Sequence, residues 1–371
     1  MTHAAVRPVH TAADLKRFIA FPYDLHRGHP LWVPPLRMDV AKLLDRDKNP
    51  FFQHAAAEYY LAEDAGKIVG RVAAIHNQAH NEFHEDNAGF FGFFDCVDDQ
   101  EVAAALLNRA AEWVRQRGLD TMRGPVSPST NDECGLLVDG FETPPTVLTP
   151  YTPPYYATLV EGAGFHKTKD LFQYQTVNNQ LPEDLVARVQ RIAMRQNITL
   201  RSVNMKDFDG EVERIKQIYN AAWERNWGFV PMTDAEIDHM AADLKKVVVP
   251  ELVVFVEKDG ETIGFGAALP DLNVALKTNP SGRLFPGILK ILWAARKIQR
   301  IRILLLGLKK EYRRTGADVL MYHWIWDKGY AKGFRWAEAG WILEDNQAMN
   351  NGLVRLGFER YKTLRLYDRS L

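Results

Sequence analysis

The chain has little cysteine and no excess of charge of either sign, and each absence narrows the possible classes of protein. Cys96 and Cys134 are the two cysteines among 371 residues. Neither lies in a metal-ligand spacing, so neither a disulfide framework nor a metal site is indicated. With 46 basic and 47 acidic side chains the formal net charge is −1, which disfavours a nucleic-acid partner. We therefore expect a protein of a reducing cytoplasm that binds no metal and no nucleic acid.

Long apolar runs are also missing. No uninterrupted stretch approaches the roughly 20 apolar residues that span a bilayer, and the first ten residues do not predict a signal peptide. Any contact with a membrane would be peripheral, on its inner face. What is present is an ordinary globular composition, with 46% apolar and 25% charged residues, over a length that suggests two domains.

The sequence contains an internal repeat. Hairpins are predicted at residues 58–75 and 252–268, around the turns Ala65-Gly66 and Asp259-Gly260. Their second strands begin alike, since Gly66-Lys67-Ile68-Val69-Gly70 aligns with Gly260-Glu261-Thr262-Ile263-Gly264. Strand-like segments before the hairpins (6–9 and 200–203) and Gly-Phe pairs after them (164–165 and 357–358) keep the same order. We therefore expect two copies of one α+β unit, with a linker near 177–183.

The second copy carries a pattern typical of a phosphate site. An apolar strand predicted at 303–308 leads into a basic turn, Lys309 to Gly316, and then into a helix predicted at 317–328. Backbone N–H groups at the start of a helix, supported by cationic side chains, bind anions. In the first copy, residues 94–101 instead contain four acidic residues, which would repel a pyrophosphate. We expect one phosphate-bearing cofactor per chain.

These residues resemble the GNAT acyltransferase superfamily, whose pyrophosphate motif is Q/R-x-x-G-x-G/A. The chain reads Arg313-Arg314-Thr315-Gly316-Ala317-Asp318, with Asp318 in place of a small residue. Glu344-Asp345-Asn346 and the later Gly357-Phe358 resemble the closing element of that fold. Aromatic and proline-rich segments at 32–36, 151–156 and 223–231 resemble a long tandem-domain bacterial branch related to bacterial ceramide synthase, over nearly the whole chain.

The resemblance implies an α+β fold of two tandem GNAT-type domains, each a mixed, mostly antiparallel sheet flanked by helices. Residues 1–178 would form a degenerate, substrate-side domain without a pyrophosphate loop. Residues 184–371 would form a CoA-binding domain with an amphipathic insertion at about 273–300. Acyl-CoA would be the co-substrate, held by Leu306, Leu308, Lys309, Arg313, Arg314, Thr315, Gly316, Ala317 and Asn346. The acceptor would contact Trp223, Asn226, Trp227 and Tyr155.

The implied reaction is acyl transfer from acyl-CoA to an amine. The substrates that the resemblance favours most are a long acyl chain and a sphingoid-type or other lipophilic amine. A backbone N–H near Leu306–Leu308 would stabilise the oxyanion. Candidate bases are Glu344 and Glu133, the latter together with Asn131. Many family members have a tyrosine four residues before the closing glycine, where this chain has Leu353. Tyr361, Tyr312 or water would then protonate the leaving thiolate.

Two other functions stay open. A catalytically silent GNAT-fold binding protein would account for Asp318 and Leu353. A Fem-like aminoacyl-tRNA-dependent transferase would account for two paired GNAT folds, although the near-neutral charge disfavours tRNA. Free thiol released from acyl-CoA by a long-chain amine distinguishes the acyltransferase from both.

The insertion predicts a basic amphipathic helix from Ile288. One side gathers apolar residues: Ile288, Ile291, Leu292, Ala294, Ala295, Ile298 and Ile301. The other gathers Lys290, Arg296, Lys297 and Arg300, with Leu289 and Trp293 among them. Such a helix either lies on an anionic membrane or packs on the protein with its basic side solvated.

Overall fold

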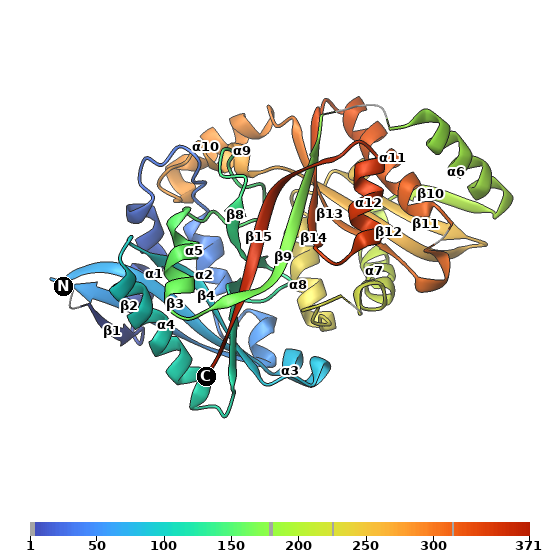
Figure 1. Cartoon of the computed structure of the whole chain (residues 1–371). Coiled ribbons are helices and arrows are strands. Elements are labelled where there is room, and N and C mark those ends of the chain that lie inside the picture. The colour runs from blue at the N-terminus through green and yellow to red at the C-terminus, as the bar shows by residue number, and fades with distance from the viewer. Residues whose placement is uncertain (1–3, 178–180, 225, 314) are drawn as a thin grey trace. The chain divides into compact units, whose positions relative to one another are not determined.

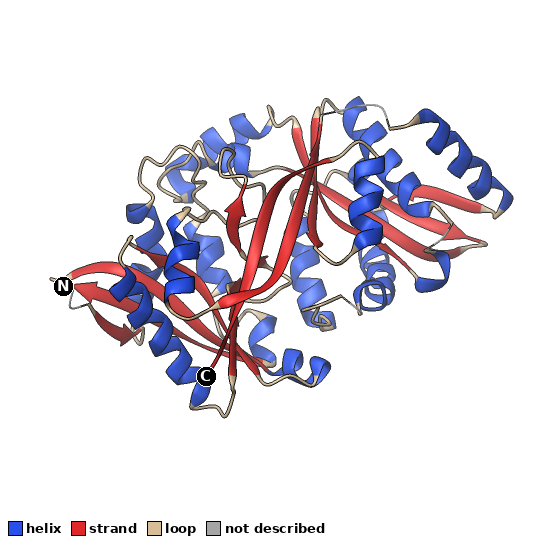
Figure 2. Cartoon of the chain, in the orientation of Figure 1, coloured by secondary structure: helices blue, strands red, loops and turns tan. Residues whose placement is uncertain are grey.

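The computed structural model describes residues 4–177, 181–224, 226–313 and 315–371, which form two compact units (Figures 1 and 2). The first unit contains the described residues up to Leu171, together with Asn273–Arg296 and Lys362–Leu371. The second contains Phe172–Leu272 and Lys297–Tyr361. The boundaries at 171/172 and 361/362 fall inside strands β9 (His166–Thr176) and β15 (Glu359–Ser370), and the other two enclose the inserted segment Asn273–Arg296. The compact units therefore differ from the two consecutive sequence copies, whose division at 178 and 184 stays a prediction.

The first unit is a sheet with the strand order β1-β2-β3-β4-β5. These strands are Ala5–Pro8, Ala55–Asp64, Lys67–Asn77, Ala88–Cys96 and Thr121–Gly124. All neighbours pair antiparallel except β4 and β5, which are parallel. Its helices are α1 (Ala12–Leu25), α2 (Arg37–Leu43), α3 (Gln78–His84), α4 (Gln100–Arg115) and α5 (Tyr155–Gly162). A short ribbon pairs β6 (Val126–Ser127) with β7 (Glu133–Cys134). Apolar residues of α4 and α5 pack on the strands to form the core of this unit.

The second unit repeats this topology, with the strand order β10-β11-β12-β13-β14. Its strands are Ile198–Ser202, Val253–Lys258, Glu261–Pro270, Arg300–Leu308 and Trp336–Leu343. Again the last pair is parallel and the others are antiparallel. Its helices are α6 (Glu183–Arg195), α7 (Phe208–Trp223), α8 (Asp234–Leu244), α11 (Ala317–Ala331) and α12 (Gln347–Arg355). The predicted repeated α+β fold is confirmed.

The two hairpins agree in detail. Both turn on two residues with positive φ, 46° and 78° at Ala65-Gly66, and 50° and 84° at Asp259-Gly260. Such primed turns match the right-handed twist of the strands they join. Each hairpin also has a register shift a few residues before its turn, between Ala62 and Glu63 in one and between Val256 and Glu257 in the other. The repeat therefore preserves a bulge as well as the turn.

The C-terminal part of β15 completes the first unit. It pairs antiparallel with β5, so that Tyr367 faces Gly124, and with β8 (Leu136–Asp139). Arg123 binds Asp368 through two 2.9 Å contacts, and Tyr367 is fully buried. Burial of an aromatic side chain and a bidentate ion pair both fix this strand in place.

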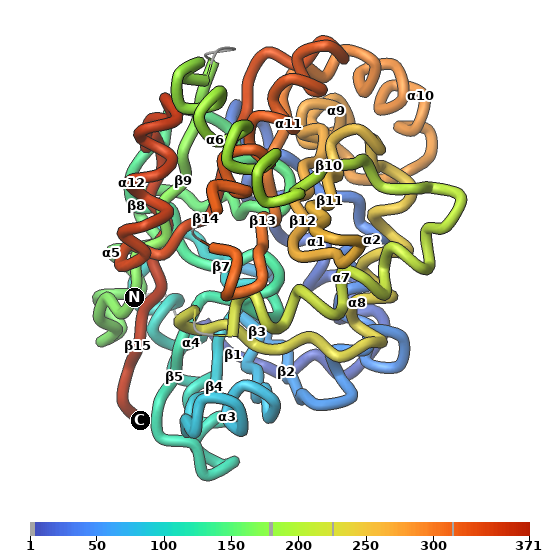
Figure 3. Tube along the Cα trace, turned by 90° about the vertical axis from the view of Figure 1, so that its right-hand side faces the viewer, coloured from blue at the N-terminus to red at the C-terminus, as the bar shows by residue number. Residues whose placement is uncertain are grey.

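The insertion forms α9 (Asn273–Leu276) and α10 (Leu284–Ala295), drawn in orange in Figure 3. The helix ends at Ala295, so the prediction that it continues to Ile301 is wrong, because Arg300 and Ile301 belong to strand β13 (Arg300–Leu308). The predicted apolar side packs only in part. Ala294 is buried and Ile288 and Ile291 are half-buried, but Leu292 is exposed together with Leu289 and Trp293. The buried residues of α10 are the small Gly287 and Ala294, and the larger apolar side chains lie half-buried or exposed.

We expect His80, on α3, to make the stability of the first unit depend on pH. Its ring is 1% exposed and packs 4.8 Å from the Phe90 ring, and burial lowers its pKa to about 4. Below about pH 6.5 this histidine binds a proton in the unfolded chain but not in the folded chain. The free energy of unfolding therefore falls as the pH drops from 6.5 to 4. We expect a loss of about 3 kcal/mol over this window. Urea unfolding at pH 7, 6, 5 and 4 measures it. The loss should be much smaller in His80→Gln and unchanged in His10→Gln, an exposed control.

Candidate functional site

The basic turn has the predicted form. From β13 the chain passes through Lys309 and the short 3-10 helix Lys310–Tyr312 to Gly316, which caps α11 with φ of 79°. Lys310 and Arg313 are exposed, and Thr315 and Gly316 are half-buried. A Cβ on Gly316 would lie 2.6 Å from the Val189 side chain of α6, so this cap needs glycine for both conformation and space. The turn is thus an accessible helix start, as an anion site requires.

Two cationic side chains of the turn are already engaged. Arg313 donates to the carbonyl of Ala222 at 2.7 Å, near the end of α7, and the Lys309 ammonium pairs with Glu261. The hydroxyl of Thr315 donates to the Tyr312 carbonyl at 2.7 Å. Arg314, predicted to bind the cofactor, lies outside the described residues. An anion would therefore be held mainly by backbone N–H groups, with Lys310 beside them.

Asp318, which departs from the motif, lies in the first turn of α11. Burial raises the pKa of its carboxyl, while hydrogen bonds with the N–H groups of Val319 and Asp318 itself oppose that rise. Those are donors that a phosphate at this helix start would use. Asp318 therefore competes with an anion both for donors and by its charge.

The strand before the turn separates from its parallel neighbour. Pairing of β13 with β14 runs from Arg300↔Trp336 to Ile303↔Ala339, whereas β13 continues to Leu308. Residues 304–308 of β13 lie beyond the paired residues, and so does the backbone edge that they would turn towards β14. Leu306 and Leu308, the predicted oxyanion and cofactor residues, belong to this segment. Backbone donors beyond a splayed strand pair suit a ligand that enters between the strands.

Trp223, at the end of α7, covers the same strand. An ideal Cβ on Gly307 would approach its ring to 2.7 Å, so glycine permits this contact. The ring also lies 6.0 Å from Phe265 and 4.9 Å from Tyr219. Two other predicted acceptor contacts, Asn226 and Trp227, follow in the turn after α7, where the N–H of Asn226 bonds the Trp223 carbonyl at 2.8 Å.

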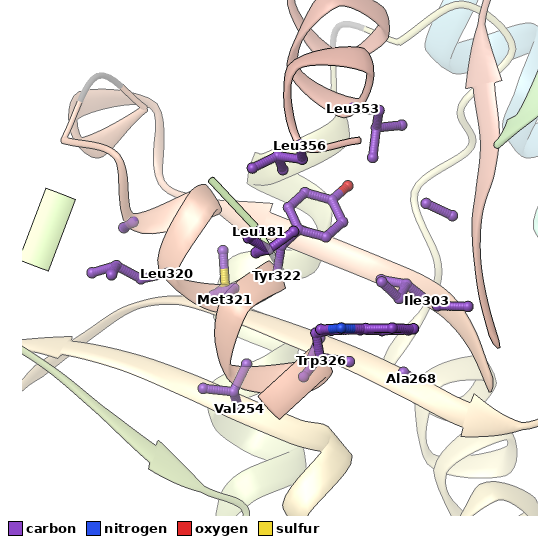
Figure 4. Packing of buried hydrophobic residues seen from close by; sticks show 14 of the residues in the cluster. Leu181, Val254, Ala268, Ile303, Leu320, Met321, Tyr322, Trp326, Leu353 and Leu356 are labelled. Atoms are coloured by element: carbon purple, nitrogen blue, oxygen red, sulfur yellow. The ribbon is translucent and has the colours of Figure 1, made fainter. Parts of the chain in front are cut away.

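A buried polar row that the sequence did not reveal crosses the second unit. Arg302 of β13 is 3.1 Å from Glu338 of β14, whose carboxylate also accepts from Gln173 of β9 at 3.3 Å and from the hydroxyl of Tyr361. The residues flanking Arg302 and Glu338 along their strands pack in the core beside α11 (Figure 4). Because side chains alternate along a strand, the row faces the other side of the sheet.

The row places a proton donor against a carboxylate. Burial, and next the charge of Glu338, raise the pKa of Tyr361 well above its ordinary value, so its hydroxyl keeps its proton. Trp336 packs edge-on against the Tyr361 ring at 6.0 Å. Arg302 also donates to the Gly340 carbonyl at 3.1 Å. A hydroxyl that already donates to a carboxylate can take a proton from a third group while passing on its own.

Asn346 caps α12, accepting from the N–H of Met349 at 3.2 Å. Glu344 is half-buried just beyond β14. Leu353 is buried in the core with Tyr322 and Leu356 (Figure 4). A tyrosine at 353 would therefore have to displace packed neighbours.

Three predicted residues belong to the first unit. The Tyr155 hydroxyl donates to the Cys96 carbonyl at 2.9 Å, so that group is used within the unit. Glu133 is exposed on β7, and the N–H of Asn131 donates to the Ser129 hydroxyl at 3.1 Å. Their predicted roles in the reaction stay predictions.

The first unit fills its equivalent helix start with its own carboxylate. Asp99 caps α4 and accepts from the N–H groups of Glu101 at 2.9 Å and Val102 at 3.3 Å. Asp95, at the end of β4, is buried against Arg71 at 2.7 Å. Both observations agree with the expected lack of a phosphate site in this copy.

The proline-rich loop of the first unit encloses a cavity of about 120 Å³. Its walls include Leu137, Phe141, Pro150 and Tyr151, and Lys362 lies beside them with its ammonium on the carbonyls of Thr143 and Pro144. The volume admits a few water-sized groups, so this cavity alone does not hold a long chain.

Among the described residues, no cluster of three or more histidine, cysteine, aspartate or glutamate side chains could hold a metal ion. Within the same residues, no helix has the length and apolar character needed to cross a bilayer.

Comparison with known proteins gives two extensive sequence matches. The chain is 38% identical over 376 residues to bacterial ceramide synthase of Caulobacter vibrioides (strain NA1000 / CB15N), covering 99% of this chain and 97% of that protein. It is 35% identical over 365 residues to protein YghO of Escherichia coli (strain K12), covering 96% and 93%. No family model matches.

Solved structures agree on the fold. A tandem GNAT protein from the clavulanic acid biosynthesis pathway, solved without AcCoA, has a TM-score of 0.58 at 14% identity, covering 99% of this chain and 98% of that one. A GCN5-related N-acetyltransferase from Sphaerobacter thermophilus has a TM-score of 0.53 at 14% identity, covering 99% and 95%. The predicted fold of two tandem GNAT-type domains is confirmed.

Proposed function

The chain belongs to the family of bacterial ceramide synthase and YghO, and from this premise we propose that it is an acyl-CoA-dependent N-acyltransferase whose acceptor is a sphingoid-type or other lipophilic amine. The observation that carries the proposal is the accessible turn between β13 and α11, with Gly316 at the helix start. It supports one CoA per chain, since the equivalent helix start of the first unit is occupied by Asp99.

The CoA would lie along the predicted residues of the second unit. Its pyrophosphate would accept hydrogen bonds from the backbone around Gly316, and the N–H groups of Thr315 and Ala317 would exchange the Tyr312 carbonyl and the Thr315 hydroxyl for phosphate oxygens. Lys309, Arg313 and Arg314 would add positive charge. Its pantetheine arm would contact the backbone of Leu306 and Leu308 beyond the β13–β14 pairing, and Asn346 at the start of α12.

In the proposed reaction the amine nitrogen attacks the thioester carbonyl carbon. The carbon–nitrogen bond forms, the carbon–sulfur bond breaks, and the thiolate of CoA leaves. A backbone N–H near Leu306–Leu308 would stabilise the oxyanion. The hydroxyl of Tyr361, predicted as a donor to the thiolate, would instead take the proton of the amine as its own passes to Glu338. Tyr312 or water would then protonate the thiolate. Glu344, and Glu133 with Asn131, are the other candidate bases, and the acceptor would contact Trp223, Asn226, Trp227 and Tyr155.

The proposal is tested with the purified full chain. Incubation with long-chain acyl-CoA and a long-chain sphingoid base should release free thiol and an equimolar N-acyl product, followed by a thiol reagent and by mass spectrometry. Substituting a short polar amine should abolish the product. If CoA binds but no amine is acylated, the chain is a silent GNAT-fold binding protein, the alternative that Asp318 and the buried Leu353 support.

Replacing Asp318 by asparagine is expected to tighten CoA binding about tenfold at pH 7, since removing one repelling charge at a half-buried site is worth about 1.4 kcal/mol. Because burial raises the pKa of Asp318, the wild-type chain should bind CoA more tightly as the pH falls towards that pKa. Calorimetric titration from pH 5 to pH 8 should show this slope diminished in Asp318→Asn. Both proteins share any titration of the CoA phosphates, so the difference between them isolates Asp318. Equal affinity of the two proteins would contradict the assignment, as would a second CoA site.

A further inference from the structure

Helix α10 exposes a stripe of large apolar side chains. Phe285 and Leu289 are each 75% exposed, Leu292 is 55% exposed and Trp293 60% exposed. Leu289, Leu292 and Trp293, spaced by three and one residues, lie along one face of the helix, and Phe285 precedes them at a non-helical position with φ of −104° and ψ of 133°. Isolated apolar residues on a surface are normal, whereas a contiguous patch marks an interaction site.

The segment that leads into the helix is hydrogen-bonded to other parts of the first unit. The N–H of Arg37 donates to the Gly282 carbonyl at 2.9 Å, and its guanidinium donates to the Ser281 carbonyl at 2.8 Å. Asn273 donates to the Pro145 carbonyl at 3.0 Å. On the inner side of α10, a Cβ on Gly287 would meet Asn279 at 2.6 Å, and Ala294 is buried. The apolar stripe is therefore presented outward by a supported helix.

The surroundings of the stripe are basic. Residues 273–296 contain four basic side chains and no acidic one. All four are exposed: Lys277, Arg283, Lys290 and Arg296. Because the whole chain has a formal charge of −1, the remainder carries −5. Positive charge is thus concentrated around the exposed apolar stripe.

We propose that α10 is a membrane-docking helix that binds the surface of a bilayer containing anionic lipids. The stripe would enter the boundary between headgroups and acyl chains, with Phe285 and Trp293 at the depth that aromatic side chains favour. The flanking lysines and arginines would bind the anionic headgroups. Packing of this face on a second copy is disfavoured, because a two-fold contact would bring two such basic helices together.

Flotation of the full chain with vesicles tests this proposal without acyl-CoA or amine, so its outcome is separate from that of the proposed function. Binding to vesicles of phosphatidylglycerol and phosphatidylethanolamine should exceed binding to phosphatidylcholine vesicles at least tenfold, and should weaken as salt is raised. The double variant Lys290→Glu/Trp293→Glu should lose at least tenfold of the binding to anionic vesicles. Brominated lipids should quench the fluorescence of the wild-type chain more than that of Trp293→Phe.

The matched control is Val354→Glu/Arg355→Glu, which introduces the same charges at an exposed apolar and an exposed basic residue of α12. It should bind vesicles like the wild type. Since all four positions are exposed, both double variants should keep the wild-type melting temperature. The proposal is overturned by a wild-type chain that does not float, or by equal binding of the two double variants. It is also overturned by a concentration-dependent dimer that Lys290→Glu/Trp293→Glu abolishes, since a second copy would then cover the face.

Discussion

Replacing Tyr361 by phenylalanine is expected to lower kcat for acyl transfer about a hundredfold, with little change in KM. The substitution removes the hydroxyl that would receive the amine proton and pass its own to Glu338. Glu338 would keep Arg302 at 3.1 Å and Gln173 at 3.3 Å, so no buried charge is left unpaired. Steady-state rates of thiol release from pH 6 to pH 9 measure the loss, and the pH dependence of kcat should change with it.

A second variant tests the relay itself. Glu338→Gln should lower kcat by a similar factor, and the double variant should lose little more, because both residues would serve one proton path. Tyr322→Phe is the matched control, since Tyr322 is a buried tyrosine of the same unit that packs near Phe358, away from the row. Full activity of Tyr361→Phe would show that the row is structural and would return the role of base to Glu344 or Glu133.

Replacing Asp95 by alanine is expected to destabilise the first unit by about 3–5 kcal/mol. Asp95 is buried and joins Arg71 at 2.7 Å, His26 at 3.2 Å and the Tyr156 hydroxyl at 3.0 Å. Without it the guanidinium of Arg71 stays buried, with the carbonyl of Phe18 at 2.9 Å as a remaining acceptor. Urea unfolding at pH 7 measures the loss, and hydrogen exchange of peptides from β3 and β4 assigns it to the first unit.

The pH dependence of this effect has a definite sign. Burial alone would raise the pKa of Asp95, but Arg71 and His26 hold it below its ordinary value. The ionised carboxylate therefore stabilises the fold above about pH 4, and that contribution is lost as the pH falls through the folded pKa. The difference between wild type and Asp95→Ala should shrink accordingly. Asp24→Ala, which removes an exposed ion pair with Arg27, should change stability little at any pH.

The sequence predicts best what is local. The turns at Gly66 and Gly260 require positive φ, and alternating apolar residues flank them. Both hairpins could therefore be predicted from the sequence alone. The helix start at Gly316 and the cap at Asn346 were predictable for the same reason, since each depends on a few consecutive residues.

The polar row could not be predicted, because its members come from distant parts of the sequence. Gln173 and Tyr361 are nearly 190 residues apart, and Arg302 and Glu338 meet only because β13 and β14 pair in parallel. A buried ion pair leaves no local pattern when its partners lie on separate strands. The engagement of Arg313 by the Ala222 carbonyl is hidden in the same way.

The exposed face of α10 shows a different limit. Helical periodicity separates apolar from basic residues, but it does not say how wide the contact with the rest of the unit is. In α10 only the small Gly287 and Ala294 are buried, and Leu292 is exposed although it lies on the apolar side of the predicted helix. Only the packed structure distinguishes a buried apolar side from an exposed one.

The pairing of β15 with β5 has a consequence for synthesis. During translation, residues up to Leu171 leave the ribosome almost two hundred residues before the strand that pairs with Thr121–Gly124. The first unit therefore has an open sheet edge, and the site of Tyr367 stays unfilled, until β15 has been synthesised. Nascent chains in that interval present an unsatisfied strand, which is the kind of surface that chaperones bind.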